Sequence, residues 1–173
     1  MKIKEVEKFA KENYSMSTLT RFNTTPRIIN QSVACHSYFV SLISLFICEK
    51  MKLSDESTLK CLKMSTIHDL AEAELGDIIY PVRVKFEKLN EILDEEERNV
   101  IENKLGEQYR DLFDEFEECK TIEAIIVKLS DAMEANIYCK EEVNMGNKNM
   151  KKIIKETNQR IKQLWKKLEN ARK

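Results

Sequence analysis

The stretch Ile67-His68-Asp69-Leu70-Ala71-Glu72 places one imidazole and two carboxylates within about one helical turn, between apolar residues that favour burial. Buried titratable groups destabilise a fold unless an opposite charge or a metal ion compensates them. The second histidine of the chain, His36, lies in another apolar stretch, residues 32–40. The pattern indicates two core helices that present polar side chains to one shared site.

Length and charge limit the possible classes. The 173 residues, 42% of them hydrophobic, are enough to bury one core, and we expect a single domain over residues 1–173. A net charge of −1 gives no general attraction to nucleic acid or to an anionic membrane. No apolar run approaches the roughly 18 residues that span a bilayer, and residues 1–7 alternate in charge rather than forming a signal peptide. These features predict a cytoplasmic protein with neither a nucleic-acid nor a membrane partner.

The cysteines are also consistent with a cytoplasmic protein. Their number is odd, their spacing is wide, and no Cys-x-x-Cys pair occurs among Cys35, Cys48, Cys61, Cys119 and Cys139. We therefore expect reduced, mostly buried thiols rather than a disulfide framework or a zinc ribbon.

Helical patterns run along the whole chain and predict an all-α fold. The three glycines and two prolines fall where helices should end, and no stretch alternates with a period of two. Ser54 and Thr121 are suitable N-caps for two of the helices. We predict a bundle of about six or seven helices, with segments at 2–13, 31–52, 55–73, 84–105, 108–119, 121–145 and 147–170.

Two segments carry opposite charge. Residues 87–118 hold 13 acidic and 4 basic side chains, and residues 148–173 hold 10 basic and 2 acidic ones. Apolar residues recur at helical spacing in the second segment, which predicts an amphipathic basic C-terminal helix over 147–173 with a solvated Lys/Arg face. Contact with the acidic segment, an oligomer interface or an anionic ligand are the alternatives.

Helical spacing suggests how a metal site assembles. His68 and Asp69 are about 100° apart on a helix, close enough to bind one ion. Glu72, four residues after His68, lies on the same side and can reach a water at the ion without being a ligand. His36 can supply a third ligand, and Asp131, an acid within the apolar run 125–133, can supply a fourth.

These residues resemble the sequence signature of a known family. The order His36, His68-Asp69, Asp131 resembles the H…HD…D signature of the HD-domain metal-dependent phosphohydrolases. Residues 67–83 resemble the HD-x-x-E-x-x-x-GD-x-x-x-P-V-K tract of the YfbR-like bacterial 5′-deoxynucleotidases, and residues 126–147 resemble their later Asp helix. The resemblance covers about residues 18–150.

The resemblance implies a single HD-domain helical bundle with the metal site between its central helices. The ion would be one divalent Mn, Co, Fe, Zn, Ni or Mg per chain, and the sequence does not choose among them. Its expected ligands are His36, His68, Asp69 and Asp131.

The implied reaction is hydrolysis of a (deoxy)nucleoside 5′-monophosphate to nucleoside and phosphate by a metal-activated water. Glu72 would assist proton transfer, and Asp77 would position the water or protonate the leaving oxygen. Arg21 matches an arginine that contacts the phosphate. Phe22 stands where relatives often carry a Trp against the sugar. Family members are commonly homodimers or higher homo-oligomers, and the C-terminal helix with Trp165 offers one interface.

Some residues have a second interpretation. Arg83 and Lys85 follow the catalytic tract closely enough to reach a phosphate, but both are equally compatible with surface charges. Asp77 could belong only to a helix C-terminal turn. In the family, acids usually stand immediately before the first histidine and a few residues earlier, where this chain has Cys35 and Gln31. Loss of such carboxylates would weaken metal binding or change its preference.

Two alternative functions remain from the sequence. One is a compact HD-type deoxynucleoside triphosphate triphosphohydrolase, which Arg83, Lys85 and the basic C-terminal segment would suit. The other is a non-catalytic helical binding module with a vestigial site, for which the altered positions Gln31 and Cys35 would be the indication.

Overall fold

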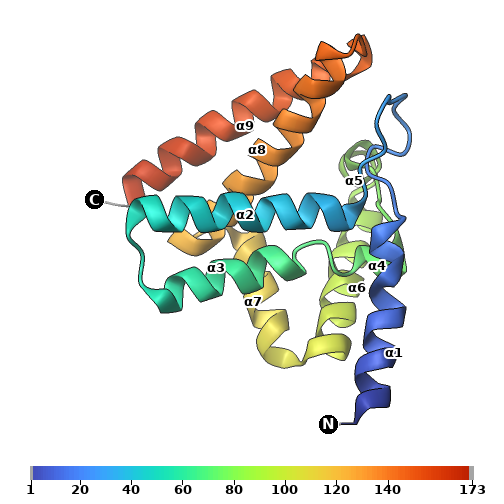
Figure 1. Cartoon of the computed structure of the whole chain (residues 1–173), viewed down its shortest axis with the longest axis vertical. Coiled ribbons are helices and arrows are strands. Elements are labelled where there is room, and N and C mark those ends of the chain that lie inside the picture. The colour runs from blue at the N-terminus through green and yellow to red at the C-terminus, as the bar shows by residue number, and fades with distance from the viewer. Residues whose placement is uncertain (1, 172–173) are drawn as a thin grey trace.

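The computed structural model describes residues 2–171, apart from the side chain of Tyr80, and it is all-α (Figure 1). Helices account for 79% of the chain and no strand forms among the described residues, so the predicted fold class is confirmed. The seven predicted segments correspond to α1 (Ile3–Asn13), α2 (Val33–Met51), α3 (Asp55–Ile67), α6 (Glu87–Leu105), α7 (Glu107–Glu118), α8 (Ile122–Asn144) and α9 (Lys151–Ala171). Short helices are added at η1 (Tyr14–Ser17), α4 (Glu72–Leu75), α5 (Tyr80–Lys85) and η2 (Lys148–Met150).

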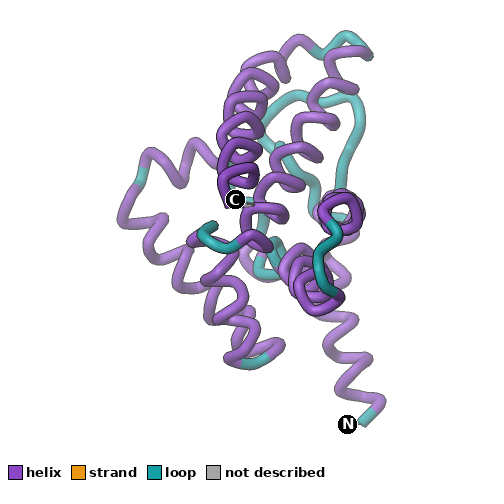
Figure 2. Tube along the Cα trace, turned by 90° about the vertical axis from the view of Figure 1, so that its left-hand side faces the viewer, coloured by secondary structure: helices purple, strands orange, loops and turns teal. Residues whose placement is uncertain are grey.

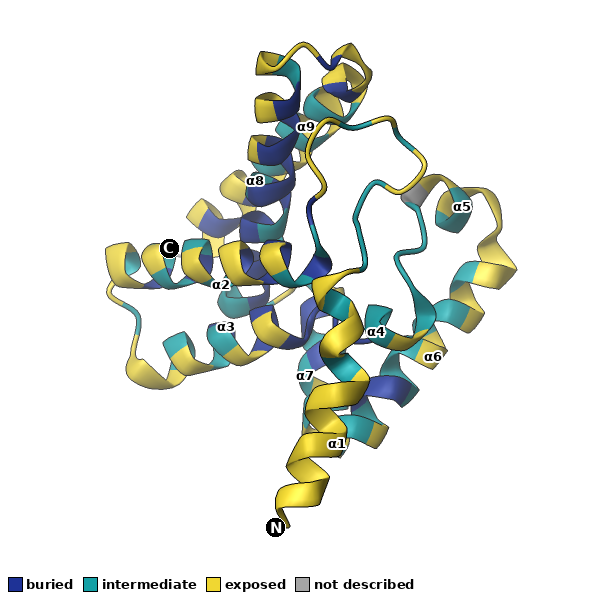
Figure 3. Ribbon diagram, turned by 45° about the vertical axis from the view of Figure 1, so that its right-hand side comes forward, coloured by how far each residue is buried: buried dark blue, intermediate teal, exposed yellow. Residues whose placement is uncertain are grey.

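Helix α8 lies at the centre of the bundle. It packs against α2, α3, α7 and α9, and α2 and α3 lie side by side across it (Figure 1). The buried faces of α8 and α2 turn toward each other, whereas the outer turns are exposed (Figure 3). A run in α8 from Ala124 to Leu129 is almost entirely buried. The apolar pattern at 125–133 therefore predicted a core helix correctly. Asp131 lies on that helix at the edge of the core.

Helix α3 ends earlier than predicted, immediately before the His68-Asp69 doublet. The segment 55–73 was expected to be one helix, but α3 ends at Ile67 and residues 68–71 form a turn that leads into α4. The backbone N–H of Leu70 bonds to the carbonyl of Ile67, and that of Glu72 to the carbonyl of Asp69. These bonds span three residues, so the backbone tightens there.

A second correction concerns residues 80–86. The predicted helix 84–105 is divided at Phe86, whose φ of −122° and ψ of 78° are not helical. Pro81 lies in the first turn of α5, where a proline is favourable, rather than marking the end of a helix. The predicted caps are confirmed: the Ser54 hydroxyl accepts from the N–H of Ser57, and the Thr121 hydroxyl accepts from that of Ala124.

The loop between η1 and α2 closes on itself at its base (Figure 2). Thr20 and Ser32 form an isolated antiparallel bridge, and the Arg21 N–H donates to the Gln31 carbonyl at 3.0 Å. Farther out, the buried carboxylate of Glu142 on α8 accepts from the N–H groups of two loop residues, Ile28 and Ile29. Residues 20–32 are thereby held against α8, and Arg21 lies where the loop meets the core.

Helix α2 is long and apolar enough to cross a membrane by length and composition, although serines and His36 interrupt its apolar run. A core helix of a soluble protein passes the same test, and α2 packs against α3 and α8. All five cysteines are free thiols; Cys48, Cys61 and Cys139 are buried and Cys35 is exposed. The expectation of reduced, mostly buried thiols agrees with this arrangement.

Candidate metal centre

Two histidines and an aspartate converge between α2 and the end of α3. The Nε2 atoms of His36 and His68 lie 3.2 Å apart. Asp69 Oδ2 lies 3.4 Å from Nε2 of His36 and 3.2 Å from Nε2 of His68. One ligand atom from each of these residues lies within 4.8 Å of the other two, an arrangement that can hold a metal ion.

Asp131 reaches the same point from α8. Its Oδ1 lies 3.5 Å from Nε2 of His36, so all four predicted ligands meet between the central helices. Burial raises the pKa of the Asp131 carboxyl, but His36 and Arg160 outweigh burial and hold this pKa below its usual range. Burial also raises the pKa of Asp69, and the two histidines and Arg21 lower it to well below the ordinary value. Both aspartates are therefore ionised over the physiological pH range.

The chemistry of this donor set fits a divalent cation. Asp69 Oδ2 is buried and receives no hydrogen bond from the residues that the structure describes. A buried carboxylate oxygen is unfavourable without a donor or a cation. His68 Nδ1 lies 2.8 Å from the Ser65 carbonyl, which can only accept, so Nδ1 carries a proton and Nε2, which faces Asp69, is the nitrogen left to bind a cation. Imidazole and carboxylate ligands suit several first-row divalent metals.

Glu72 lies beside the cluster without joining it. It lines the same cavity as His68, Asp69 and Asp131, and its Oε2 is buried with no hydrogen-bond partner within residues 2–171. Burial raises the pKa of Glu72 to about 9, and the neighbouring charges of Asp69 and Asp77 add to the effect. Strongly shifted carboxyl groups beside a metal cluster are typical of proton-transfer residues.

Arg21, Phe22 and Asp77 lie together at the base of the loop. Arg21 Nη2 is 3.9 Å from Asp131 Oδ1, so the guanidinium approaches the metal ligands. The Phe22 ring stacks on Tyr138, with centroids 5.4 Å apart and an angle of 8° between the planes. Burial raises the pKa of the Asp77 carboxyl, against the opposing charge of Arg21.

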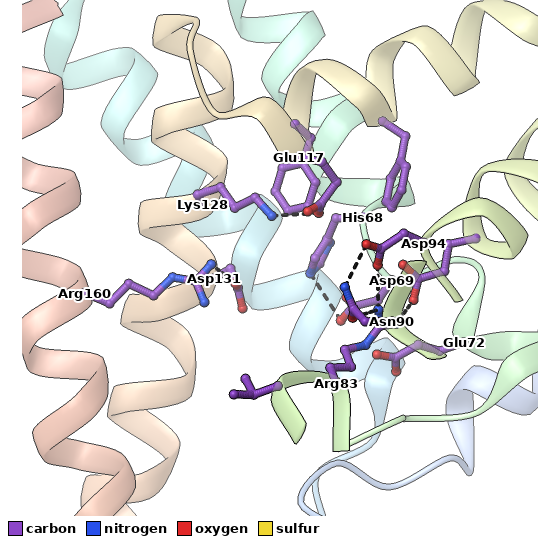
Figure 4. Close-up of a pocket in the computed structure, with 14 residues that line it drawn as sticks. His68, Asp69, Glu72, Arg83, Asn90, Asp94, Glu117, Lys128, Asp131 and Arg160 are labelled. Carbon is purple, nitrogen blue, oxygen red and sulfur yellow. Dashed lines mark hydrogen bonds and ion pairs between the residues drawn. The ribbon is translucent and has the colours of Figure 1, made fainter. Parts of the chain in front are cut away.

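A cavity of about 410 Å³ opens beside the cluster, lined by residues of several helices (Figure 4). Its basic side chains face acids: Arg83 pairs with Asp94 and Glu97, and Lys128 Nζ lies 2.7 Å from Glu117 Oε1. Arg160 of α9 enters from the opposite side, 3.8 Å from Asp131 Oδ2.

Lys85 and Cys35 lie outside this arrangement. Lys85 is exposed and its Nζ lies 5.3 Å from the centroid of the Phe86 ring, so the structure does not bring it to the cavity beside Arg83. Cys35 is exposed on α2, on a different side of that helix from the buried His36.

The comparisons with known proteins agree with this geometry. A family model described as an HD domain matches residues 17–172. The chain belongs to the HD-domain family. The 5′-deoxynucleotidase HDDC2 of Dictyostelium discoideum is 30% identical over an alignment of 132 residues, and the match covers 68% of this chain and 68% of that protein.

Solved structures show the same HD-domain fold. The PH0347 protein from Pyrococcus horikoshii OT3 superimposes with a TM-score of 0.77 at 28% identity, covering 98% of this chain and 95% of that one. The HD phosphohydrolase DatZ of cyanophage S-2L, bound to dA and one catalytic Zn²⁺, has a TM-score of 0.60 at 22% identity over 75% of this chain and 69% of that one. The resemblance of the sequence to HD-domain phosphohydrolases is thus confirmed.

Several polar residues of this HD domain make contacts that were not predicted from the sequence. Glu134 contacts His36, Gln31 contacts Glu134, and Arg160 and Lys128 reach the cavity. Glu134 follows Asp131 by three residues, so helical spacing could have placed it beside the site. The partner of Gln31 could not have been found, because residues 31 and 134 meet only through the packing of the loop on α8.

Proposed function

We propose that this HD-domain protein is a metal-dependent phosphohydrolase that converts (deoxy)nucleoside 5′-monophosphates to nucleoside and phosphate. The observation that supports the proposal most directly is the convergence of two imidazoles and two carboxylates beside a cavity, with Asp69 Oδ2 buried and unpartnered among the described residues. The name of the Dictyostelium relative, 5′-deoxynucleotidase, supports the same substrate class.

One divalent ion per chain, held by His36, His68, Asp69 and Asp131, would polarise the phosphoryl group and activate water near neutral pH. Zinc is one candidate, since DatZ binds a catalytic Zn²⁺ in the same fold. Mn, Co, Fe, Ni and Mg remain candidates because mixed nitrogen and oxygen ligation suits several of them.

The other residues of the site have separate roles in this proposal. Glu72, beside the ligands and shifted to a high pKa, exchanges the proton of the attacking water. Asp77 orients that water or protonates the leaving 5′-oxygen. Arg21, close to Asp131, neutralises charge on the phosphoryl oxygens. Phe22, held by its stack on Tyr138, packs against the sugar.

The cavity favours a monophosphate over the triphosphate alternative. A triphosphate tail would need free cations beyond the metal, but Arg83 and Lys128 are each paired with acids in the cavity wall. Asp94, Glu97 and Glu117 would also repel further phosphates. Arg83 would therefore act on the substrate only after losing an acidic partner, and Lys85 is too exposed to define the pocket.

A substrate panel tests the proposal. Metal-free protein is reconstituted separately with each divalent ion and given deoxy and ribo mono- and triphosphates, and released phosphate is distinguished from released triphosphate. We expect inorganic phosphate from monophosphates, abolished in Asp131→Asn. Release of intact triphosphate would transfer the assignment to the triphosphohydrolase class, and metal-independent turnover would contradict the mechanism.

We also propose a cytoplasmic homodimer or higher homo-oligomer. The free state of all five thiols supports a reducing compartment. An exposed apolar face on α2, formed by Tyr38, Phe39, Leu42 and Phe46, supports contact with a second copy more strongly than Trp165, whose Nε1 already donates to Glu169. Sedimentation analysis should give a multimer that dissociates in Phe46→Glu and persists in Trp165→Glu; a monomeric wild type would contradict the proposal.

A further inference from the structure

Glu134 is a buried carboxylate on α8 that contacts both His36, a proposed metal ligand, and Arg21, the proposed phosphate-binding residue. Its residue is only 5% exposed, and it lies one turn after the ligand Asp131. Oε2 lies 2.5 Å from Nδ1 of His36, and Oε1 accepts from the Gln31 amide at 2.5 Å. Arg21 Nη1 lies 3.4 Å from Oε2. A buried acid with three polar partners is held in a fixed position.

The contact with His36 determines which ring nitrogen faces the metal ligands. An ionised carboxylate can only accept, so Nδ1 of His36 carries the proton and donates to Glu134. Nε2 is then the nitrogen that faces Asp69 and Asp131, which lie 3.4 Å and 3.5 Å away, and it is the one available to a metal ion. His68 has the same tautomer through the Ser65 carbonyl. The two rings therefore present equivalent nitrogens, one oriented by a neutral acceptor and one by an anion.

The same oxygen also places the arginine. Arg21 Nη1 lies 2.7 Å from Nδ1 of His36, and both groups are donors when Nδ1 is protonated. Glu134 Oε2 is the acceptor that both can reach, and its charge balances the guanidinium in this half-buried location. Glu134 thus ties a metal ligand to the residue that faces the phosphate.

We propose that Glu134 is a positioning residue for His36 and for Arg21. It orients the His36 ring through Nδ1, and it fixes Arg21 relative to the ion. Gln31 supports it by donating to the second carboxylate oxygen. The role of Arg21 in this inference rests on the proposed function, whereas the role toward His36 rests only on metal binding.

The test compares Co²⁺ affinity, measured by competition with a chromogenic chelator, in wild type and Glu134→Gln. The variant can remain folded, because Gln31 Oε1 is buried without a partner in residues 2–171 and can accept from the new amide after the Gln31 side chain rotates. We expect affinity to fall about 10- to 100-fold, the range typical for loss of a partner that orients a metal ligand. Equal affinity in a folded Glu134→Gln protein would overturn the proposal.

Two further variants separate positioning from folding. Glu142→Gln removes an equally buried carboxylate two turns along α8, which contacts Ile28, Ile29 and Asn147, so it should lower stability and leave Co²⁺ affinity unchanged. The exchange Gln31→Glu with Glu134→Gln returns one negative charge to the pair and should recover most of the affinity. If Glu134→Gln does not fold, the exchange variant decides: affinity near wild type supports the proposal, and a folded exchange variant that binds as weakly as His36→Ala contradicts it.

The outcomes also distinguish this inference from the proposed function. If wild-type protein binds Co²⁺ but hydrolyses no nucleotide, the proposed substrate class fails, whereas loss of affinity in Glu134→Gln still supports the role toward His36. If turnover is present, Glu134→Gln should also raise the KM for the monophosphate when measured at saturating Co²⁺, because Arg21 loses its anchor. An unchanged KM would remove Arg21 from the inference.

Discussion

At the residue scale, the proposed ligands and the proposed proton-transfer residue differ in the direction of their pKa shifts. His36, His68, Asp69 and Asp131 share one centre, where both aspartates are ionised because the histidines and arginines outweigh burial. Glu72, only three residues from Asp69, behaves oppositely, because burial and its like-charged neighbours raise its pKa to about 9. Environment rather than residue type assigns the two roles.

Glu72→Gln should therefore reduce turnover while leaving the ion in place. General acid–base groups contribute about 10²- to 10⁴-fold, and we expect kcat to fall within this range. Elemental analysis of protein prepared without chelator should show the same metal content as wild type. Loss of metal together with turnover would instead identify Glu72 as a ligand.

Substitution of Arg21 by lysine should show whether the site needs a planar guanidinium or only a positive charge. Its two terminal nitrogens lie near Glu134 and Asp131, an arrangement that a single ammonium cannot reproduce. Arg21→Lys should lower kcat/KM for a monophosphate by about 10- to 100-fold, as expected for the loss of one hydrogen bond to a charged group. Steady-state kinetics at saturating metal measure the effect, and wild-type kcat/KM would remove Arg21 from phosphate binding.

At the element scale, sequence patterns located the long helices and missed the breaks that shape the site. Leu70 and Ala71 are buried, so the apolar pattern continues through a turn where the helix has already ended. Periodicity measures burial and cannot detect a change from four-residue to three-residue hydrogen bonding. The approach of His36 and Asp131 was predictable because polar residues in apolar helices need compensation, whereas the contact of Glu134 with Gln31 depends on how a loop packs on α8.

That loop provides a pH-dependent test of stability. The Glu142 carboxylate accepts from Ile28 at 2.8 Å, from Ile29 at 2.6 Å and from Asn147 at 2.7 Å. Burial raises its pKa, but these donors lower it below the ordinary value of 4.5. A depressed pKa means that the ionised group stabilises the fold above pH 4.5 and that this contribution disappears as pH falls through the folded pKa.

Urea unfolding of wild type and Glu142→Gln across the acidic range should show this dependence. Near neutral pH the variant should be less stable by about 1–3 kcal/mol, because one buried N–H loses its acceptor. The difference should shrink as pH falls from 4.5 toward the folded pKa of Glu142, because the unfolded wild type takes up a proton before the folded protein does. A difference that stays constant with pH would show that shape, and not charge, holds the loop.

At the scale of the whole molecule, the two oppositely charged segments contribute to one cavity. The acidic segment supplies Asp94, Glu97 and Glu117 to the wall, and the basic helix α9 supplies Arg160. The solvated face predicted for the C-terminal helix is only part of its role, because its apolar side packs Leu164 and Leu168 into the core and Arg160 reaches Asp131. The charge counts of the two segments indicate this separation, which the net charge of −1 alone does not.

The acidic wall should determine how many phosphates the enzyme accepts. In the double variant Asp94→Asn with Glu97→Gln, Arg83 loses its two anionic partners and the cavity loses two negative charges. The cavity should therefore repel the additional phosphates of a triphosphate less strongly. We expect the ratio of kcat/KM for a deoxynucleoside triphosphate to that for the monophosphate to rise about three- to tenfold, a modest change because charges in a partly solvated cavity are screened. Glu107→Gln with Asp111→Asn removes the same charge from exposed positions outside the cavity and should leave the ratio unchanged. An equal rise in both double variants would attribute selectivity to net charge, and no rise in either would mean that Arg83 and its partners do not contact the substrate.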